Sequence, residues 1–433
     1  MEELSFQEKK WLDLLAQYLI PRGWSADYSC RRYWELIKDN DEDYPSKSTV
    51  DRFLKKLEDN GFIEIKRGGQ HGGRASNYIF LKKYKYHGIC LTGVVPLDSP
   101  LYINRGADES CKHLMSAVSH TGTIPFIRIK SARHNGKTSL LIRLRQFLQN
   151  EKKCKVILVD LKSIDHSILN DETEFFNKFT ELILSEFNEE NQYNRSSTLL
   201  TKMSAAQRCT ELLEPVFRRS KNIVLIIDGV DCILHLPSLK TSFTGLLRTW
   251  HESKMKMIDN SSVSWARIAI AYSTEPYSEN DIRDSPFDNV GTPIDLYEFT
   301  VDQISNLADI YGLDWNTNDI SKLMGMIEGH PYLVNLALYN FSTKRIISLE
   351  HLEKIAISET SPFISHLRKC MSAVEKNPDL YNSIKKLLNG QKIDRRSEFY
   401  LTMLGIVKQN IDSNEIEFRC DLYKQYFSNT TLS

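Results

Sequence analysis

Residues 131–138, Ser-Ala-Arg-His-Asn-Gly-Lys-Thr, join a glycine to a lysine and a threonine in a spacing that could bind phosphate. An apolar run at 124–129 precedes this segment, and an amphipathic helix with leucines on one side is expected after it. In such a strand, loop and helix, backbone N–H groups at the helix start face an anion. Lys137 would reach the β and γ phosphates, and Thr138 would hold Mg²⁺. The predicted cradle contains Ser131, Asn135, Gly136, Lys137, Thr138 and Ser139.

A carboxylate follows a second apolar run. Residues 223–227 are all aliphatic and deliver Asp228 at the end of an expected strand, where it could hold the metal directly or through water. Gly229 comes next, although most energetic ATPases place Glu there to polarise the attacking water. Asp231 could act on Mg²⁺ or water, or it could cap the following helix. We therefore predict binding of ATP or ADP with Mg²⁺, and weak hydrolysis.

Two further segments contain polar groups for which the sequence allows more than one role. The apolar run 268–271 ends in Tyr272-Ser273-Thr274, whose hydroxyls could sense the γ-phosphate or could be ordinary turn residues. Arg283 lies in a polar stretch and could be an arginine finger, in cis or in trans, or a surface arginine.

The elements that must position these groups are indicated by hydrophobic patterns. From about 95 to 300, apolar runs at 124–129, 156–159, 223–227 and 268–271 alternate with amphipathic stretches, which is typical of buried parallel strands in an α/β sheet. From 301 to 433 the pattern is mainly helical, with a short β-like pair around 405–407 and 415–418. The carboxyl ends of the parallel strands should gather Lys137, Thr138 and Asp228 at one edge.

Residues 1–93 differ from the rest in pattern and local charge. Two amphipathic helices are expected first, and a third over 46–61 has Val50, Phe53, Leu54 and Leu57 on one side. Strands at 62–66 and 78–81, with a glycine-rich tip between them, predict a basic hairpin. Three helices and a hairpin describe a winged helix, and residues 46–52 resemble the recognition segment of winged helices in bacterial repressors and replication proteins of plasmids and phages.

The winged helix carries a local positive charge. The whole chain is neutral, with 56 Lys plus Arg against 56 Asp plus Glu, but residues 46–86 hold ten basic residues against four acidic ones. Such a patch suits phosphate contacts, with a helix available for the major groove. Alternatively, the domain could bind protein, or the charged face could simply be solvated. The predicted DNA-binding residues are Lys47, Thr49, Arg52, Lys55, Lys56, Arg67 and Arg74.

The order of motifs after residue 94 resembles the bacterial AAA-like domain of the STAND class of signal-transducing P-loop ATPases. The resemblance spans about 330 residues, and its departures are Ser131 for the first loop glycine and Gly229 for glutamate. The Asp-Gly-x-Asp form of 228–231 is similar to that of the NACHT-type STAND ATPases, which act as switches. The segments that carry the resemblance are residues 102–109, 131–139, 228–231, 285–291, 329–333, 366–367, 380–381, 422–423 and 426–427.

This resemblance implies an α/β P-loop NTPase core at 94–300, a helical lid at 301–360 and a C-terminal winged-helix-like subdomain at 361–433, after the N-terminal winged helix at 1–93. It also implies that Gly329-x-Pro331 replaces the second sensor of related ATPases, with Pro331 near the base or ribose. From the residues alone, Gly329-His330-Pro331 is a helix break followed by a helix restart.

We therefore expect an ATP-dependent regulatory switch that binds DNA, for transcriptional control or defence against mobile elements. The alternatives are an oligomeric AAA-like ATPase that remodels or loads DNA in replication or transposition, and a DNA-binding scaffold that binds nucleotide without hydrolysing it. A homo-oligomer and a protein partner or effector are both compatible with these functions. No window is apolar enough to span a membrane, and the acidic residues after Met1 are unlike a signal peptide, so we expect a cytoplasmic protein.

Overall fold

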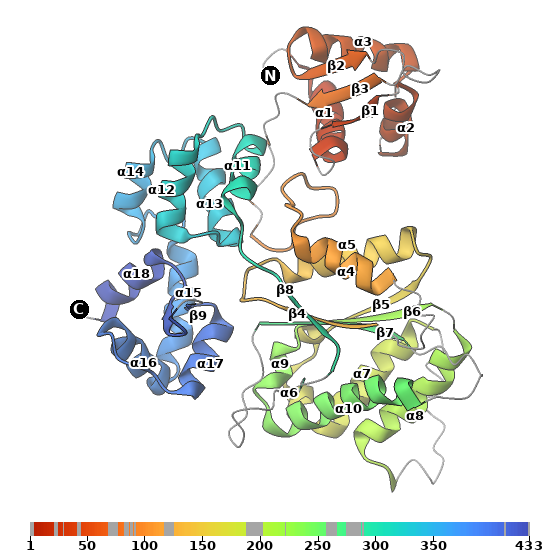
Figure 1. Cartoon of the computed structure of the whole chain (residues 1–433), viewed down its shortest axis with the longest axis vertical. Coiled ribbons are helices and arrows are strands. Elements are labelled where there is room, and N and C mark those ends of the chain that lie inside the picture. Colours follow the sequence, from red (N-terminus) through yellow and green to blue (C-terminus); the bar gives the residue numbers. More distant parts are fainter. Residues whose placement is uncertain are drawn as a thin grey trace. The chain divides into compact units, whose positions relative to one another are not determined.

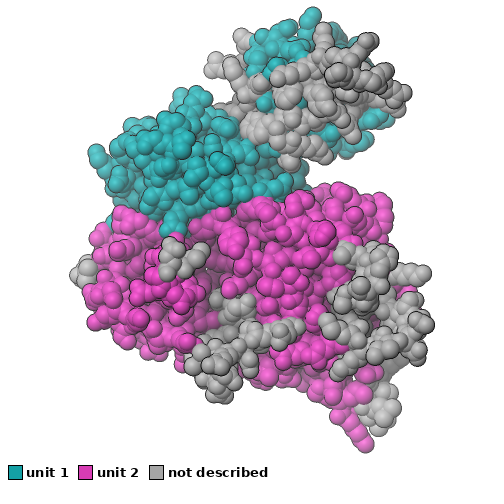
Figure 2. Space-filling model, in the orientation of Figure 1, with its two compact units in different colours: residues 1–104, 299–364 teal, residues 105–298, 365–433 magenta. Residues whose placement is uncertain are grey.

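The computed structural model divides the chain into two compact units, which Figure 2 colours separately. One contains residues 1–104 and 299–364, and the other contains residues 105–298 and 365–433. The structure describes residues 4–20, 25–28, 30–40, 45–67, 77–81, 86, 90, 92–116, 125–187, 202–220, 222–256, 266–273, 287, 290–410 and 413–431.

The second unit is built on a five-stranded parallel sheet. Its strands are β4 (Phe126–Lys130), β5 (Lys155–Asp160), β6 (Ile223–Asp228), β7 (Arg267–Tyr272) and β8 (Thr292–Asp295), in the order β5-β6-β7-β4-β8. Every residue of β6, which lies between β5 and β7, is buried, and this burial explains its uninterrupted aliphatic run. The four predicted runs correspond to β4–β7. β8 was not predicted, because it has four residues of which only Ile294 is buried.

Helices cover both faces of this sheet (Figure 1). On one face lie α4 (Gly106–Ser116) and α5 (Lys137–Asn150), and on the other lie α7 (Glu172–Ser185), α8 (Ala205–Arg219) and α10 (Pro237–Lys256). Alternate residues of β6 enter the two cores: Leu225 and Ile227 pack with the aromatic rings of α7 and α10, whereas Val224 and Ile226 pack with leucines of α5. The short elements between them are η2 (Leu161–Ser163), α6 (His166–Leu169) and α9 (Asp231–Leu234).

The carboxyl-terminal part of the same unit is mainly helical. It contains α15 (Ile364–Glu375), α16 (Pro378–Leu388), α17 (Arg395–Leu404) and α18 (Asp421–Thr431). The antiparallel pair β9 (Val407–Gln409) and β10 (Ile416–Phe418) lies between α17 and α18, where the sequence predicted a β-like pair. α17 ends at Gly405, whose φ of 77° is the left-handed conformation that glycine adopts without strain.

The other unit begins with six elements, α1 (Phe6–Leu19), β1 (Ser25–Tyr28), α2 (Cys30–Asn40), α3 (Lys47–Asp59), β2 (Ile63–Arg67) and β3 (Asn77–Leu81). The strands form an antiparallel sheet in the order β1-β3-β2. α3 buries Val50, Phe53, Leu54 and Leu57, and the Phe53 ring packs edge to face on Trp11 of α1. The sequence predicted the three helices and the hairpin. It did not predict β1, whose four residues are mostly small or polar.

Four helices complete this unit: α11 (Val301–Ile310), α12 (Thr317–Ile327), α13 (Pro331–Ser342) and α14 (Leu349–Ile355). The backbone of Gly329 lies against that of Phe299, whose N–H donates to the Gly329 carbonyl at 2.8 Å. Pro331 is the first residue of α13, where its missing N–H has no helical partner to lose. Over the described parts of the chain, no helix combines the length and apolarity needed to cross a bilayer.

Gly329→Ala should destabilise the chain strongly. A Cβ at this position would lie 2.1 Å from the Phe299 carbonyl oxygen, a backbone atom that no side-chain rotation can move away. We expect a loss of roughly 3 kcal/mol or more, measured as a lower midpoint of thermal unfolding. Gly325→Ala is the matched control, because nothing lies within 4 Å of its Cβ position and alanine favours the helix. Equal midpoints for the two variants would contradict the close contact.

Candidate nucleotide-binding site

The predicted phosphate loop leaves the carboxyl end of β4 and leads into α5. Gly136 is the N-cap of α5 with a φ of 91°, and a Cβ there would lie 2.9 Å from an Arg105 guanidinium nitrogen. The first N–H groups of α5 lack helical partners, so they are available to an anion. Arg105 also donates to the Asn135 carbonyl at 2.9 Å and to the Tyr297 carbonyl at 3.0 Å. These two hydrogen bonds connect the loop to the segment that follows β8.

Ser131, at the position of the first consensus glycine, anchors the loop. Its hydroxyl donates to the Leu296 carbonyl at 2.7 Å, and the Asn135 amide donates to the same carbonyl at 2.7 Å and to the Ser131 hydroxyl. Both side chains are buried. The side chains of Ser131 and Asn135 therefore hold the loop beside the end of β8, and their backbone groups line the predicted cradle. Ser139, in the first turn of α5, is buried as well.

Lys137 is the first residue of α5, and its side chain extends back into the loop. Its ammonium donates to the Ser131 carbonyl at 2.6 Å, the Ala132 carbonyl at 2.9 Å and the Ser273 hydroxyl at 3.2 Å. Desolvation lowers the pKa of Lys137 to about 8, against the opposing effect of the Asp231 and Asp228 carboxylates. The group therefore remains mainly protonated at neutral pH. Two loop carbonyl oxygens accept hydrogen bonds from the Lys137 ammonium. A phosphate oxygen bound in the loop would be an alternative acceptor for the same ammonium.

Thr138 and Asp228, the two predicted metal ligands, are in direct contact. The Thr138 hydroxyl donates to one carboxylate oxygen of Asp228 at 2.6 Å, and the Gly229 N–H donates to the other at 2.8 Å. Hydroxyl and carboxylate oxygens are ligands that Mg²⁺ prefers, so this donor set fits the ion. The Lys162 ammonium also reaches these oxygens, at 2.8 Å from Asp228 Oδ2 and 3.4 Å from Thr138 Oγ1. Burial opposes its charge, but the hydrogen bond to Asp228 gives a net raised pKa of Lys162.

Asp231 binds the end of β7. Its two carboxylate oxygens accept the Ser273 N–H at 2.7 Å and the Ser273 hydroxyl at 2.8 Å. The same hydroxyl accepts a hydrogen bond from Lys137, so Asp231, Ser273 and Lys137 form one chain of polar contacts. The sequence predicted a metal, water or capping role for Asp231. For Ser273 it left open a role as a γ-phosphate sensor or as an ordinary turn residue. The observed contacts connect these two residues to the phosphate loop.

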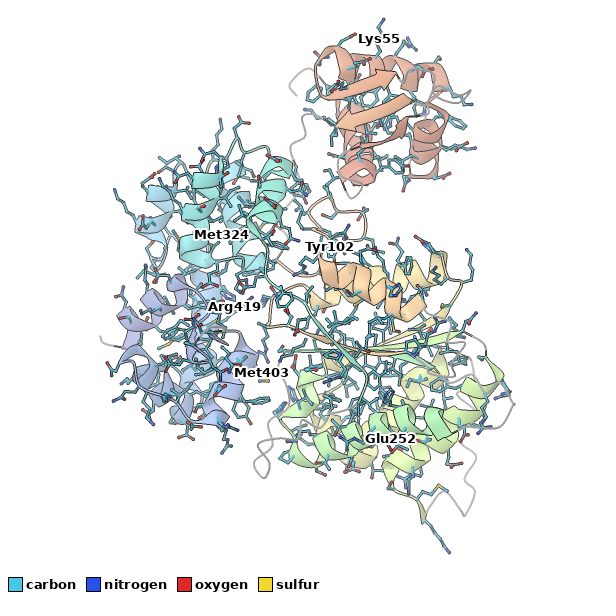
Figure 3. All side chains as sticks on the ribbon, in the orientation of Figure 1. Lys55, Tyr102, Glu252, Met324, Met403 and Arg419 are labelled. Atoms are coloured by element: carbon cyan, nitrogen blue, oxygen red, sulfur yellow. The ribbon has the colours of Figure 1, made fainter. Side chains whose placement is uncertain are left out.

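Residues near the carboxyl terminus contact the tip of the loop. Arg419, between β10 and α18 (Figure 3), donates to the Arg133 carbonyl at 3.2 Å and the Asn135 side chain at 3.4 Å, and pairs with Glu298 at 2.5 Å. The His134 ring packs edge to face on His366, which hydrogen-bonds the Tyr423 hydroxyl at 2.7 Å. Burial lowers the pKa of His366 to about 3, helped by charges at His134, Arg419 and Lys369. The loop is thus tied to the helices that follow residue 364.

The other predicted site residues belong to the other unit or fall outside the described residues. Pro331 belongs to the other unit, so its predicted place near a base or ribose stays a prediction. Arg283, Thr274 and Arg74 fall outside the described residues, and Arg67 ends β2. The sequence patterns did not indicate three basic residues that the structure brings to the loop or to Asp228, namely Arg105, Lys162 and Arg419.

α3 carries most of the predicted DNA-binding residues. Arg52 and Lys55 are exposed on the side opposite the buried apolar residues, and Figure 3 shows Lys55 directed away from the sheet of its own domain. Lys56 differs, because its ammonium pairs with Glu8 of α1 at 2.9 Å. Lys47 stacks over the Trp34 ring at 5.2 Å, and Thr49 lies in the first turn of the helix beside the Ser46 cap.

Residues 90–429 match the family described as AAA-like domain. The chain belongs to this family. An AAA-like ATPase domain implies nucleotide binding, and the parallel sheet with flanking helices is P-loop NTPase-like. The N-terminal residues before position 90 lie outside the match.

Solved structures with similarity to this chain include three proteins from different organisms. A Walker-type ATPase of Pyrococcus abyssi is 12% identical, with a TM-score of 0.45, over 74% of this chain and 94% of that one. Cdc6p of Pyrobaculum aerophilum is 13% identical, with a TM-score of 0.40, over 77% and 97%. Orc1 of Aeropyrum pernix, solved in complex with DNA, is 14% identical, with a TM-score of 0.34, over 75% and 91%. No curated protein matches the sequence.

Proposed function

We propose that this AAA-like protein binds ATP or ADP in the loop at 131–138 and uses the bound nucleotide as a switch that controls binding to DNA. The observation that carries the proposal is the contact network of Lys137, Thr138, Asp228 and Ser273 at the carboxyl edge of parallel strands. Ligands of open α/β sheets bind at this edge. The α5 amino terminus and the Lys137 ammonium would hold the phosphates.

Mg²⁺ would neutralise phosphate charge where it displaces the Lys162 ammonium, and Thr138 and Asp228 would then be its protein ligands. The residues around them favour slow turnover. Gly229 has no side chain that could polarise a water molecule, and Asp231 already accepts two hydrogen bonds from Ser273. A site with these two features suits a nucleotide that is held for long periods, as in the STAND-class and NACHT-type hypothesis.

The contacts between the loop and the C-terminal helices support coupling. Arg419 donates to the carbonyl of Arg133 and to the side chain of Asn135, so a nucleotide that rearranges the loop changes the contacts of Arg419. Ligand binding shifts a conformation only through such differences in contact energy. In this proposal the domains are those predicted from the sequence, with the winged-helix-like segment at 361–433 responding to the nucleotide and Pro331 of the lid adjoining the base or ribose.

The DNA-binding part of the proposal concerns residues 1–93. Their order of helix, strand, two helices and two strands, with an antiparallel sheet, supports a winged helix. α3 is the element available for the major groove, and it exposes Arg52 and Lys55. The basic hairpin after it, with Arg67 and Arg74, would contact the DNA backbone.

The experiment that tests this function measures both ligands on the full chain. Labelled ATP and labelled duplex are each titrated with and without the other ligand. Because coupling between two sites is reciprocal, ATP should change the affinity for DNA by the same factor as DNA changes the affinity for ATP. Factors that both equal one would contradict the switch, and absence of ATP binding would contradict the nucleotide site itself.

A second candidate is an oligomeric ATPase that remodels or loads DNA in replication or transposition. Membership of the AAA-like family favours it, since this is an ATPase domain and the predicted winged helix precedes it. Phosphate release distinguishes the candidates: DNA-stimulated turnover above about 1 per second would favour the remodelling ATPase, and none at all would favour a nucleotide-stabilised scaffold.

A further inference from the structure

Lys162 contacts the two oxygens that would otherwise hold Mg²⁺. Its ammonium lies 2.8 Å from Asp228 Oδ2 and 3.4 Å from Thr138 Oγ1. Mg²⁺ binds such oxygens directly at about 2.1 Å, or through one of its own water molecules. A metal ion and the ammonium therefore compete for the same place between Thr138 and Asp228.

The fold brings Lys162 to this place through β5. Asp160, the last residue of β5, pairs in register with Asp228, the last residue of the neighbouring β6. The Asp160 carboxylate accepts the Lys162 N–H at 3.0 Å and caps the single turn of η2. The backbone of Lys162 is thus fixed two residues beyond the strand, and its side chain extends back toward Asp228.

Gly229 provides the space for the lysine side chain. A Cβ on Gly229 would lie 2.7 Å from Lys162 Cγ and 2.9 Å from Lys162 Cε, and the φ of Gly229 is 75°. A glutamate at position 229, the residue of most energetic ATPases, would therefore collide with Lys162 as well as strain the backbone. The glycine at position 229, in place of glutamate, is therefore what allows the Lys162 side chain to lie beside Asp228.

The buried carboxylate of Asp228 is stabilised by a cation beside it. Only 3% of the Asp228 side chain is exposed, whereas 49% of the Lys162 side chain is. A buried carboxylate is costly without a positive partner, so the ion pair differs from a fully exposed one that contributes little. Among the described residues, Asp228 and Thr138 accept two of the three ammonium protons, which leaves one N–H for a phosphate oxygen.

We propose that Lys162 replaces Mg²⁺ in this pocket, so that the chain binds nucleotide diphosphate or triphosphate without a divalent ion. The inference rests on the proposed nucleotide function of the same site. The tethered ammonium supplies the positive charge beside the phosphates, and Asp228 holds the ammonium rather than a metal. Mg²⁺ can enter only after the Lys162 side chain leaves the Asp228 carboxylate.

The test compares binding of a fluorescent ADP analogue to the full chain in excess MgCl₂ and in EDTA. Wild-type affinity should differ by less than about threefold between the two buffers. Lys162→Met keeps the length of the side chain without the charge, and it should lose about tenfold or more in EDTA, the equivalent of one charge-assisted hydrogen bond. Added Mg²⁺ should restore the affinity of this variant. Lys178→Met, at an exposed pair with Glu181, is the matched control and should behave as wild type.

The outcomes separate the inference from the proposed function. No binding by the wild type in either buffer would overturn both. Wild-type binding that needs Mg²⁺, with the same dependence in Lys162→Met, would overturn the inference and leave the nucleotide site intact. A second variant, Gly229→Ala, should shift the lysine side chain and acquire the same Mg²⁺ dependence as Lys162→Met. Circular dichroism establishes that each variant is folded before its affinity is compared.

Discussion

Lys137→Ala is expected to lower the affinity of the chain for ATP by about a hundredfold or more. The ammonium is held by two loop carbonyls and the Ser273 hydroxyl, so it is already located within the predicted phosphate cradle. Each charge-assisted hydrogen bond to phosphate contributes roughly 1.5 to 3 kcal/mol, and Lys137 would make one to the β and one to the γ phosphate. Two such bonds account for the expected loss.

Calorimetric titration of ATP into the full chain measures this change. Lys376→Ala, at an exposed position after α15, is the control and should leave the affinity unchanged. Lys137→Arg keeps the charge but places a planar, longer group in a loop that fits one ammonium, so it should recover only part of the affinity. An affinity of Lys137→Ala equal to that of the wild type would show that phosphate binds elsewhere.

The features that the sequence predicted are formed by residues that lie close together along the chain. Lys137 and Thr138 are adjacent to a glycine and follow an apolar run, and Asp228 follows another, so each was visible within ten residues of chain. β4–β7 were visible because each contains a run of mainly apolar, buried residues, as expected for strands covered on both faces. β1 and β8 lack that signal, since they are short and lie at the edges of their sheets.

The residues that were missed make contacts with distant parts of the chain. Lys162 is 66 residues from Asp228, and Arg419 is 284 residues from Asn135. In the sequence, Lys162 and Arg419 cannot be distinguished from ordinary charged residues that face solvent. Asp231 was recognised, but its partner Ser273 lies 42 residues away, and this partner determines its role. Gly229 was noted as a departure, and its φ of 75° together with the position of the Lys162 side chain explains it.

Replacing Arg52 and Lys55 together with alanine should weaken duplex DNA binding by about tenfold or more and flatten its salt dependence. Both side chains are exposed on α3, opposite the residues that form the domain core. Each phosphate contact contributes about 0.9 to the slope of the logarithm of affinity against the logarithm of salt concentration, so the slope should fall by about 1.8. The measurement is fluorescence anisotropy of a labelled duplex over a series of salt concentrations.

Lys56→Ala is the matched control on the same helix. Its ammonium pairs with both carboxylate oxygens of Glu8, at 3.0 and 2.9 Å, so less of its charge is available to a phosphate than that of Arg52 or Lys55. We therefore expect the slope to change by clearly less than 0.9 in this variant. A double variant with an unchanged slope would exclude α3 as the DNA-binding face. The basic side of the domain would then be a surface for a protein partner, and the nucleotide switch would act on that partner instead of DNA.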